Sequence, residues 1–241
     1  LNTSIRICNC QCYSLYCLKN IEKRRFMSEK LSAKVFSFVG HLANFIVINL
    51  LCIACCIPIV TAGPSICAMY YCMLKVVRNQ EMKPVKDFFH SFKDNLKQGC
   101  ILQLIVLVIS IVTAFLLKYA ISIFANGSFY QVIACIIFII AFAILLDFTM
   151  LYPAQAQFAN PLNITFKNAF LFAISNLPYV LIMLLLNILP ILLFLGWTEL
   201  FIVLIPFYLF MGFASTCYVN CRFLKKIFKP YVPEESKTEE I

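Results

Sequence analysis

The sequence has little charge and little glycine for its length. Of the 241 residues, 13% are Asp, Glu, Lys or Arg and 6 are Gly, whereas 62% are hydrophobic. Soluble globular domains are about 45–50% apolar and about 25% charged. The shortage of charge therefore excludes an ordinary soluble domain and indicates a membrane protein, with the lipid bilayer as its main partner.

Sequence motifs for catalysis, phosphate binding and metal binding are also lacking. There is no Walker A sequence, HExxH or GxSxG, and six scattered glycines form no phosphate-binding loop. His41 and His90 are the only histidines, which leaves few candidates for a catalytic triad. Most of the 13 cysteines lie in apolar blocks, and the gaps in CNCQC (8–12) are too short for structural zinc. We expect no catalytic residue, no cofactor and no metal.

What the sequence does contain is long apolar blocks. Their length fits helical spans of about 20 residues better than barrel strands of about 10 residues. We therefore predict an all-α fold, a polytopic membrane helix bundle. Five blocks are clear, at residues 36–57, 100–124, 129–151, 178–195 and 199–221.

A sixth block, residues 59–77, follows the stretch PIVTAGPS (58–65). Pro58, Thr61, Gly63 and Pro64 predict a turn that leads into a helix. If this turn faces outward, there are six spans, both termini are cytoplasmic, and nineteen of the twenty Lys and Arg residues fall inside. This distribution favours six spans. The alternative is five spans and a re-entrant segment at 59–77.

Two inner loops have the pattern of amphipathic helices lying on the inner surface. One follows Pro84, where Phe88, Phe89, Phe92 and Leu96 repeat at helical spacing. These four residues are a candidate partner-docking face, although both helices can equally cover the floor of the bundle. The second helix follows Asn160-Pro161, and its apolar face comprises Leu162, Phe166, Ala169 and Ala173.

Polar residues inside the spans form a candidate intramembrane site, because polar groups in a bilayer need partners. The alternative for His41, Asn44, Asn49, Gln103 and Asn187 is hydrogen bonding between helices, and for the charged residues it is anchoring near the membrane surface. The candidate site comprises His41, Asn44, Gln103, Lys118 and Asp147.

The chain is expected to have three parts: an N-terminal segment (1–33), a transmembrane domain (34–222) and a disordered cytoplasmic tail (223–241). EKRRF precedes Met27, and its codons can spell a ribosome-binding sequence, so translation is expected to start at Met27. The formal charge of +9 does not indicate nucleic acid binding, because the cations lie beside apolar blocks.

Three stretches resemble the YesL-like family of small bacterial integral membrane proteins. They are PIVTAGP followed by AMYY, then FFHSFKDNLKQ, and YPAQAQFANPLNITFKNAFLFAISNLP. The resemblance covers Lys34 to Arg222. This sequence departs from the family pattern at Gly40-His41 and Ala156-Gln157, where the family often has charges.

The resemblance implies an uncharacterised membrane protein that accompanies bacterial carbohydrate-uptake and sensor systems. We therefore expect an accessory protein of the bacterial cell membrane whose membrane or cytoplasmic partner belongs to a carbohydrate transport system. The alternative function is a small-solute transporter with a polar site inside the bundle.

Overall fold

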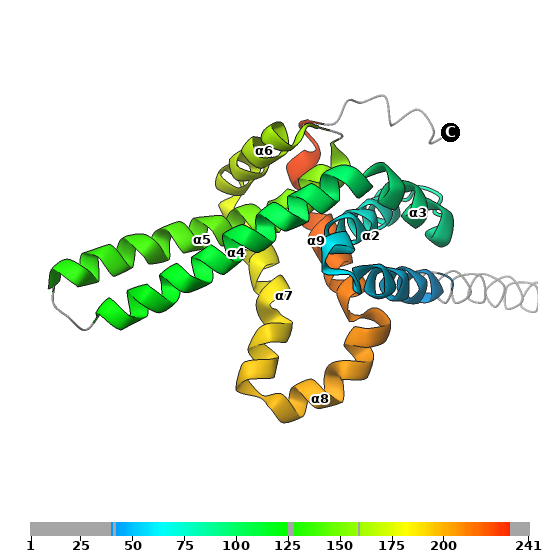
Figure 1. The fold of residues 1–241 in the computed structure, drawn as a ribbon. Helices are drawn as coiled ribbons and strands as arrows, with labels where there is room; N and C mark the ends of the chain where they lie inside the picture. The colour runs from blue at the N-terminus through cyan, green and yellow to red at the C-terminus, as the bar shows by residue number, and fades with distance from the viewer. Residues whose placement is uncertain (1–39, 41, 125–127, 159, 232–241) are drawn as a thin grey trace, which may run out of the picture. The chain divides into compact units, whose positions relative to one another are not determined.

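The structure consists of helices joined by short turns (Figure 1). The computed structural model describes residues 40, 42–124, 128–158 and 160–231. These residues contain no strand, so the all-α prediction is confirmed for this part of the chain. Contacts divide the chain into two units, Leu1–Asn44 and Phe45–Ile241. In chain order the elements are the helix Leu42–Cys56, η1 (Ile59–Thr61), α2 (Ala62–Val77), α3 (Pro84–Asp94), α4 (Leu96–Ile123), α5 (Ser128–Gln157), α6 (Leu162–Ser175), α7 (Leu177–Gly196), α8 (Thr198–Phe207), the π-helical turn η3 (Tyr208–Gly212) and α9 (Phe213–Phe228).

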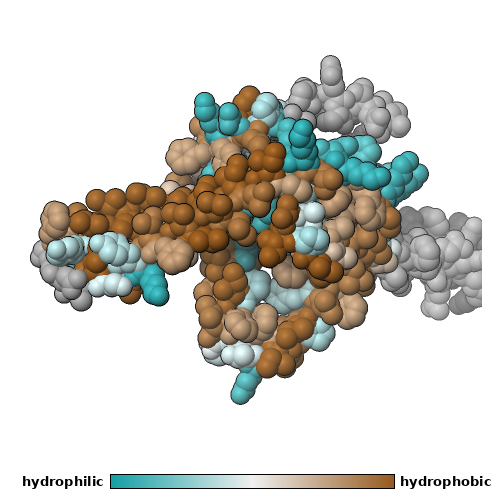
Figure 2. All heavy atoms as spheres, viewed as in Figure 1, coloured by the Kyte–Doolittle hydropathy of each residue, from teal (hydrophilic) through white to brown (hydrophobic). Residues whose placement is uncertain are grey.

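Five helical stretches of the described residues are long and apolar enough to cross a membrane. They differ in hydropathy, from 2.9 for Leu96–Ile123 down to 1.3 for Ile59–Val77. Hydrophobic surface covers α4, α5, α7 and α8 in Figure 2. These features agree with a multi-pass membrane protein. The five stretches are Ile59–Val77, Leu96–Ile123, Phe129–Gln157, Leu177–Gly196 and Thr198–Phe228, and Leu42–Cys56 is a shorter apolar helix.

The predicted turn at PIVTAGPS is present. The Thr61 hydroxyl donates hydrogen bonds to the carbonyls of Cys55 (2.7 Å) and Pro58 (2.9 Å), which ties the end of the first helix to η1. Helix α2 begins immediately afterwards and contains Gly63 and Pro64, both buried, in its first turn. The residues Pro58, Thr61, Gly63 and Pro64 therefore form the structural turn that the sequence predicts.

The turn packs against the start of α4. Gly63 and Gly99 bring the two backbones into direct contact, since a Cβ on Gly99 would lie 2.9 Å from the Pro64 nitrogen. Gly99 is separated from Ile123, at the far end of α4, by about 36 Å of helix. If residues 59–77 crossed the membrane, the turn at PIVTAGPS would lie at the surface opposite the 78–83 loop. It would then be near Ile123 instead of Gly99. The observed contact fits the re-entrant alternative for residues 59–77 better than a simple outer hairpin tip.

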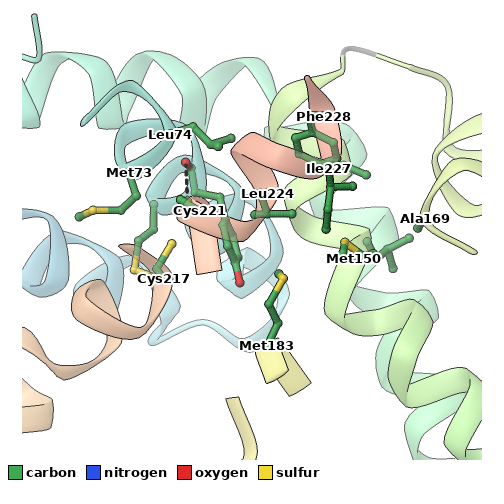
Figure 3. Packing of buried hydrophobic residues seen from close by; sticks show 14 of the residues in the cluster. Met73, Leu74, Met150, Ala169, Met183, Cys217, Cys221, Leu224, Ile227 and Phe228 are labelled. Carbon is green, nitrogen blue, oxygen red and sulfur yellow. Dashed lines mark hydrogen bonds between the residues drawn. The ribbon is translucent and has the colours of Figure 1, made fainter. Parts of the chain in front are cut away.

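The main hydrophobic core surrounds α2, which contacts α3, α4, α5 and α9. Met73 and Leu74 of α2 are buried with Cys217, Cys221 and other residues of α9, as Figure 3 shows. The Cys221 thiol lies 3.8 Å from the Tyr70 carbonyl. The buried cysteines thus behave as small hydrophobic residues with weak S–H donors, as the sequence predicts.

The predicted boundary of the C-terminal tail is wrong. Residues 223–228 continue α9 instead of starting a disordered segment, because Leu224, Ile227 and Phe228 are buried against the core. Phe228 packs edge-on against Phe158 and Phe172, with ring centroids 5.3 and 5.4 Å away. Residues 1–33, with the start-site prediction at Met27, and residues 232–241 lie outside the described part of the chain.

Candidate ligand cavity and polar network

A cavity of about 310 Å³ lies between α2, α5, α7 and α9. It borders the middle of α7, where Asn187 and Pro190 contribute to its wall. Its lining contains hydroxyl, amide and thiol groups but no Asp, Glu, Lys, Arg or His. The lining residues are Ile66, Met69, Tyr70, Leu145, Phe148, Thr149, Tyr152, Leu184, Leu186, Asn187, Pro190, Phe213, Thr216 and Cys217.

Two polar side chains of the cavity lining, Tyr70 and Asn187, are joined by Asn220, which does not itself line the cavity. The Asn220 amide nitrogen of α9 donates to the Asn187 side-chain oxygen of α7 (2.9 Å) and to the Tyr70 hydroxyl of α2 (3.3 Å). Asn220 is fully buried, and its side-chain oxygen has no hydrogen-bond partner among the described residues. A buried acceptor of this kind costs about 1–3 kcal/mol, so a donor at this position would be stabilising.

A second network joins the start of α4, the end of α5 and the start of α6. Gln155, which is 2% exposed, is its centre. Its amide nitrogen donates to Gln98 (2.8 Å) and Asn95 (3.3 Å), and its oxygen accepts from the Thr165 hydroxyl (2.9 Å). The Gln155 amide therefore connects all three helices. This role explains why the YPAQAQ stretch is polar although the rest of α5 is largely apolar.

The charged residues at the ends of α2 and α3 have defined partners. Lys75 pairs with Asp87 across the α2–α3 hairpin (3.1 Å), and Arg78 donates to the Gln157 side-chain oxygen (2.6 Å). Burial lowers the pKa of the Arg78 guanidinium, but an arginine stays protonated in proteins. Gln157 is one of the positions at which this chain departs from the YesL-like pattern, and here its role is to hold Arg78.

Asn49 supports the irregular part of the last span. Its amide nitrogen donates to the carbonyls of Tyr208 (3.1 Å) and Leu209 (2.7 Å), and its oxygen accepts from the Ala214 N–H (2.9 Å). These groups belong to the π-helical turn that follows Pro206, where the regular i to i+4 bonding is interrupted. Interhelical hydrogen bonding, the alternative given for Asn49, is confirmed.

Two residues of the predicted intramembrane site, Gln103 and Lys118, lie far apart on α4. Gln103 accepts a hydrogen bond from the Tyr152 hydroxyl (2.6 Å), whereas Lys118 is exposed about 22 Å further along α4. Asp147 is half-buried on α5 and does not line the cavity. Asn44 is half-buried in the other unit, and His41 lies outside the described residues. The structure therefore does not bring Gln103 and Lys118 together, and the intramembrane site as a whole stays a prediction.

The four residues of the predicted docking face differ in exposure. Phe88 is fully buried beneath α3, and Phe92 is partly buried against the same core. Leu96 belongs to α4, because α3 ends at Asp94. Of the four residues, Phe89 (38%) and Leu96 (40%) are exposed. The structure thus assigns the α3 phenylalanines mainly to covering α2.

Sequence reasoning missed the cluster of Tyr70, Asn187 and Asn220 beside the cavity, and it missed the second network. Tyr70 and Asn220 stand alone in apolar or mixed stretches, so helical periodicity gives no reason to pair them. The signal that was available is the YPAQAQ stretch, whose two glutamines interrupt an apolar helix. A buried glutamine needs several partners at once, and this requirement predicts a network without identifying its members.

Comparison with known protein families adds one observation. Residues 45–116 match a family described as a protein of unknown function, DUF624. This DUF624 segment is less than half of the chain, and it contains Asn49, the turn at PIVTAGPS, and the contact between Gly63 and Gly99. No curated protein matches the chain, and no solved structure matches it.

Proposed function

We propose that this protein is a non-enzymatic accessory protein of the bacterial cell membrane that binds a small uncharged solute between its helices. The observation that carries the proposal is the cavity between α2, α5, α7 and α9. Its volume is at the lower end of the roughly 300–1,000 Å³ range of small-molecule sites, which favours a small ligand. Its lining offers hydrogen bonds without charge, which favours a neutral ligand.

A neutral sugar fits this chemistry. Sugar hydroxyls both donate and accept hydrogen bonds, and the lining presents the phenol of Tyr70, the amide of Asn187 and the hydroxyl of Thr216. The resemblance to the YesL-like family supports a place beside carbohydrate uptake or its sensing. The alternative of a small-solute transporter uses the same cavity, and uptake into proteoliposomes distinguishes transport from binding alone.

Binding of neutral monosaccharides by the purified full-length protein in nanodiscs tests the proposal. We expect at least one hexose or pentose to raise the melting temperature, because a ligand at 100 times its Kd stabilises by about 2.7 kcal/mol. Asn187→Leu is expected to weaken this sugar at least tenfold, since removing a hydrogen-bond partner in a buried site costs about 1–3 kcal/mol. Thr216→Val tests a second lining residue without a change of shape.

Ser110→Ala is the matched control, because Ser110 is exposed on α4 away from the cavity lining. It should bind the sugar as the unchanged protein does. The proposal fails if no neutral monosaccharide shifts the melting temperature, or if Asn187→Leu and Thr216→Val both bind with unchanged affinity.

A protein partner from a carbohydrate transport system is the second part of the proposal. Val85 and Phe89 of α3 are 51% and 38% exposed, and they are the apolar residues that this helix leaves uncovered. They lie beside exposed charges of the same helix, an arrangement typical of interface rims. This smaller surface replaces the four-residue face predicted from sequence.

We propose that both termini are cytoplasmic, because with six spans this orientation places nearly all lysines and arginines on the inner side. With five spans and a re-entrant segment, the C-terminus and the 78–83 loop would still be cytoplasmic, but the N-terminus would lie outside. Cysteines at Gln80 and Thr198 test it in a background without other accessible thiols. A membrane-impermeant reagent applied to intact cells should modify Thr198→Cys and leave Gln80→Cys unmodified. The reverse pattern contradicts the orientation. Thr61→Cys decides the span count: modification supports six spans, and protection supports the re-entrant segment.

A further inference from the structure

The last two turns of α9 carry a cationic face. Arg222, Lys225, Lys226 and Lys229 are all exposed, and at 100° per residue they fall within about 100° of arc. The opposite face of the helix is buried through Leu224, Ile227 and Phe228. The residues Phe213–Phe228 include no acidic residue. This part of α9 is therefore an amphipathic helix with one apolar and one purely basic side.

Aromatic rings position two of these cations. The Arg222 guanidinium lies 5.6 Å from the ring centroid of Tyr218, and the Lys226 ammonium lies 5.8 Å from that of Tyr179 in the first turn of α7. Phe223 packs on Tyr179, with ring centroids 5.9 Å apart. Tyrosines beside lysines and arginines are typical of the boundary between hydrocarbon and headgroups.

The cations of α9 lack carboxylate partners among the described residues. Among the described residues, ion pairs join Lys75 to Asp87 and His90 to Asp94, and neither involves α9. Lys225 donates to a neutral group, the Val77 carbonyl (3.0 Å). A face whose positive charges have no carboxylate partner in the described part of the chain favours an anionic ligand.

Exposed apolar residues lie on the same two helices as this cationic face, and Val219 is one helical turn before Arg222. Val219 of α9 is 39% exposed, and Leu181 and Ile182 of α7 are 42% and 45% exposed. A ligand that places an anion against Arg222 and Lys226 can thus lay a hydrocarbon chain along α7 and α9. A soluble anion uses only the first of these surfaces.

We propose that α7 and α9 bind an anionic phospholipid, with its phosphate against Arg222 and Lys226 and an acyl chain on Val219, Leu181 and Ile182. The surface has the two components of such a lipid in the right order, a basic headgroup site followed by an apolar track. This proposal is independent of the solute cavity, whose lining shares no residue with it.

Native mass spectrometry of the full-length protein, titrated with phosphatidylglycerol or phosphatidylcholine of identical chains, tests the proposal. Phosphatidylglycerol should bind more tightly. Arg222→Gln combined with Lys226→Gln should weaken its binding roughly 30-fold, because each cation near a membrane surface contributes about fivefold. Arg222→Lys should retain most of the affinity, since the charge is kept.

Lys83→Gln combined with Lys86→Gln is the matched control, because both residues are exposed lysines outside α7 and α9. It should leave phosphatidylglycerol binding within twofold. Equal binding of the two lipids, or an equal loss in the control, overturns the proposal. Competition by millimolar inorganic phosphate or by an acidic peptide also overturns it, because either result assigns the cationic face to a soluble anion or a protein. The melting temperature in phosphatidylcholine confirms that each variant is folded.

Discussion

Replacing Gly99 by valine is expected to lower the melting temperature of the protein by about 6–12 °C. Gly99 faces the backbone of Pro64, and an added Cβ would lie 2.9 Å from its nitrogen and 3.0 Å from its Cα. Two backbones cannot move apart as a flexible side chain can, so the cost is expected near the upper end of the overpacking range, about 3 kcal/mol. A free energy change of this size corresponds to the stated shift for a chain of this length.

Thermal unfolding in nanodiscs, followed by circular dichroism, measures this effect. Gly196→Val is the control, because a Cβ at Gly196 has no atom within 4 Å. It adds the same side chain to a helical glycine in open space and should change the melting temperature by no more than about 2 °C. Equal melting temperatures for the two variants would show that α2 and α4 are not in backbone contact.

The helices themselves could be predicted closely from the sequence. The predicted blocks 129–151 and 178–195 correspond to Phe129–Gln157 and Leu177–Gly196, because apolar runs of this length have few other structures available in a bilayer. Pro84 and Asn160-Pro161 also marked the starts of α3 and α6 to within one or two residues. These predictions depend on local sequence alone.

The packing of these helices could not be predicted in the same way. An apolar residue such as Phe88 can face lipid, a partner protein or another helix with the same sequence pattern, and only the fold shows that it covers α2. The distribution of Lys and Arg likewise predicts on which side of the membrane each loop lies, but it does not predict how the helices pack against one another. The contact between Gly63 and Gly99 depends on the return of α3 along α2, which no periodicity encodes.

Which polar residues meet could not be predicted for a related reason. Polar residues on one predicted face, such as Gln103 and Lys118, share an orientation but lie several turns apart. The residues that do meet, Tyr70, Asn187 and Asn220, come from three helices. Their pairing is set by helix packing, across 33 residues of chain for Asn187 and Asn220 and 150 for Tyr70 and Asn220. Sequence identified Asn187 as a hydrogen-bonding residue, but not its partners.

Asn49→Leu is expected to destabilise the protein by about 3 kcal/mol and to loosen the last span at its π-helical turn. The substitution removes three hydrogen bonds, two to the carbonyls of Tyr208 and Leu209 and one from the Ala214 N–H. Each interhelical bond in a membrane protein contributes about 0.6–1.7 kcal/mol. Leucine is similar in size to asparagine, so the cost comes mainly from backbone groups that lose their partner inside the core.

Hydrogen exchange distinguishes this local effect from general unfolding. The amide of Ala214 should exchange faster in Asn49→Leu, while amides in the middle of α5 keep their protection, because the π-helical turn loses its support first. Asn44→Leu is the control within the same helix, since Asn49 and not Asn44 holds the turn. If Asn49→Leu leaves Ala214 exchange and the melting temperature unchanged, the side chain of Asn49 does not support the last span. If it accelerates exchange at Ala214 alone, the irregular turn of the last span is a separately stabilised element of the bundle, held in place from the first helix.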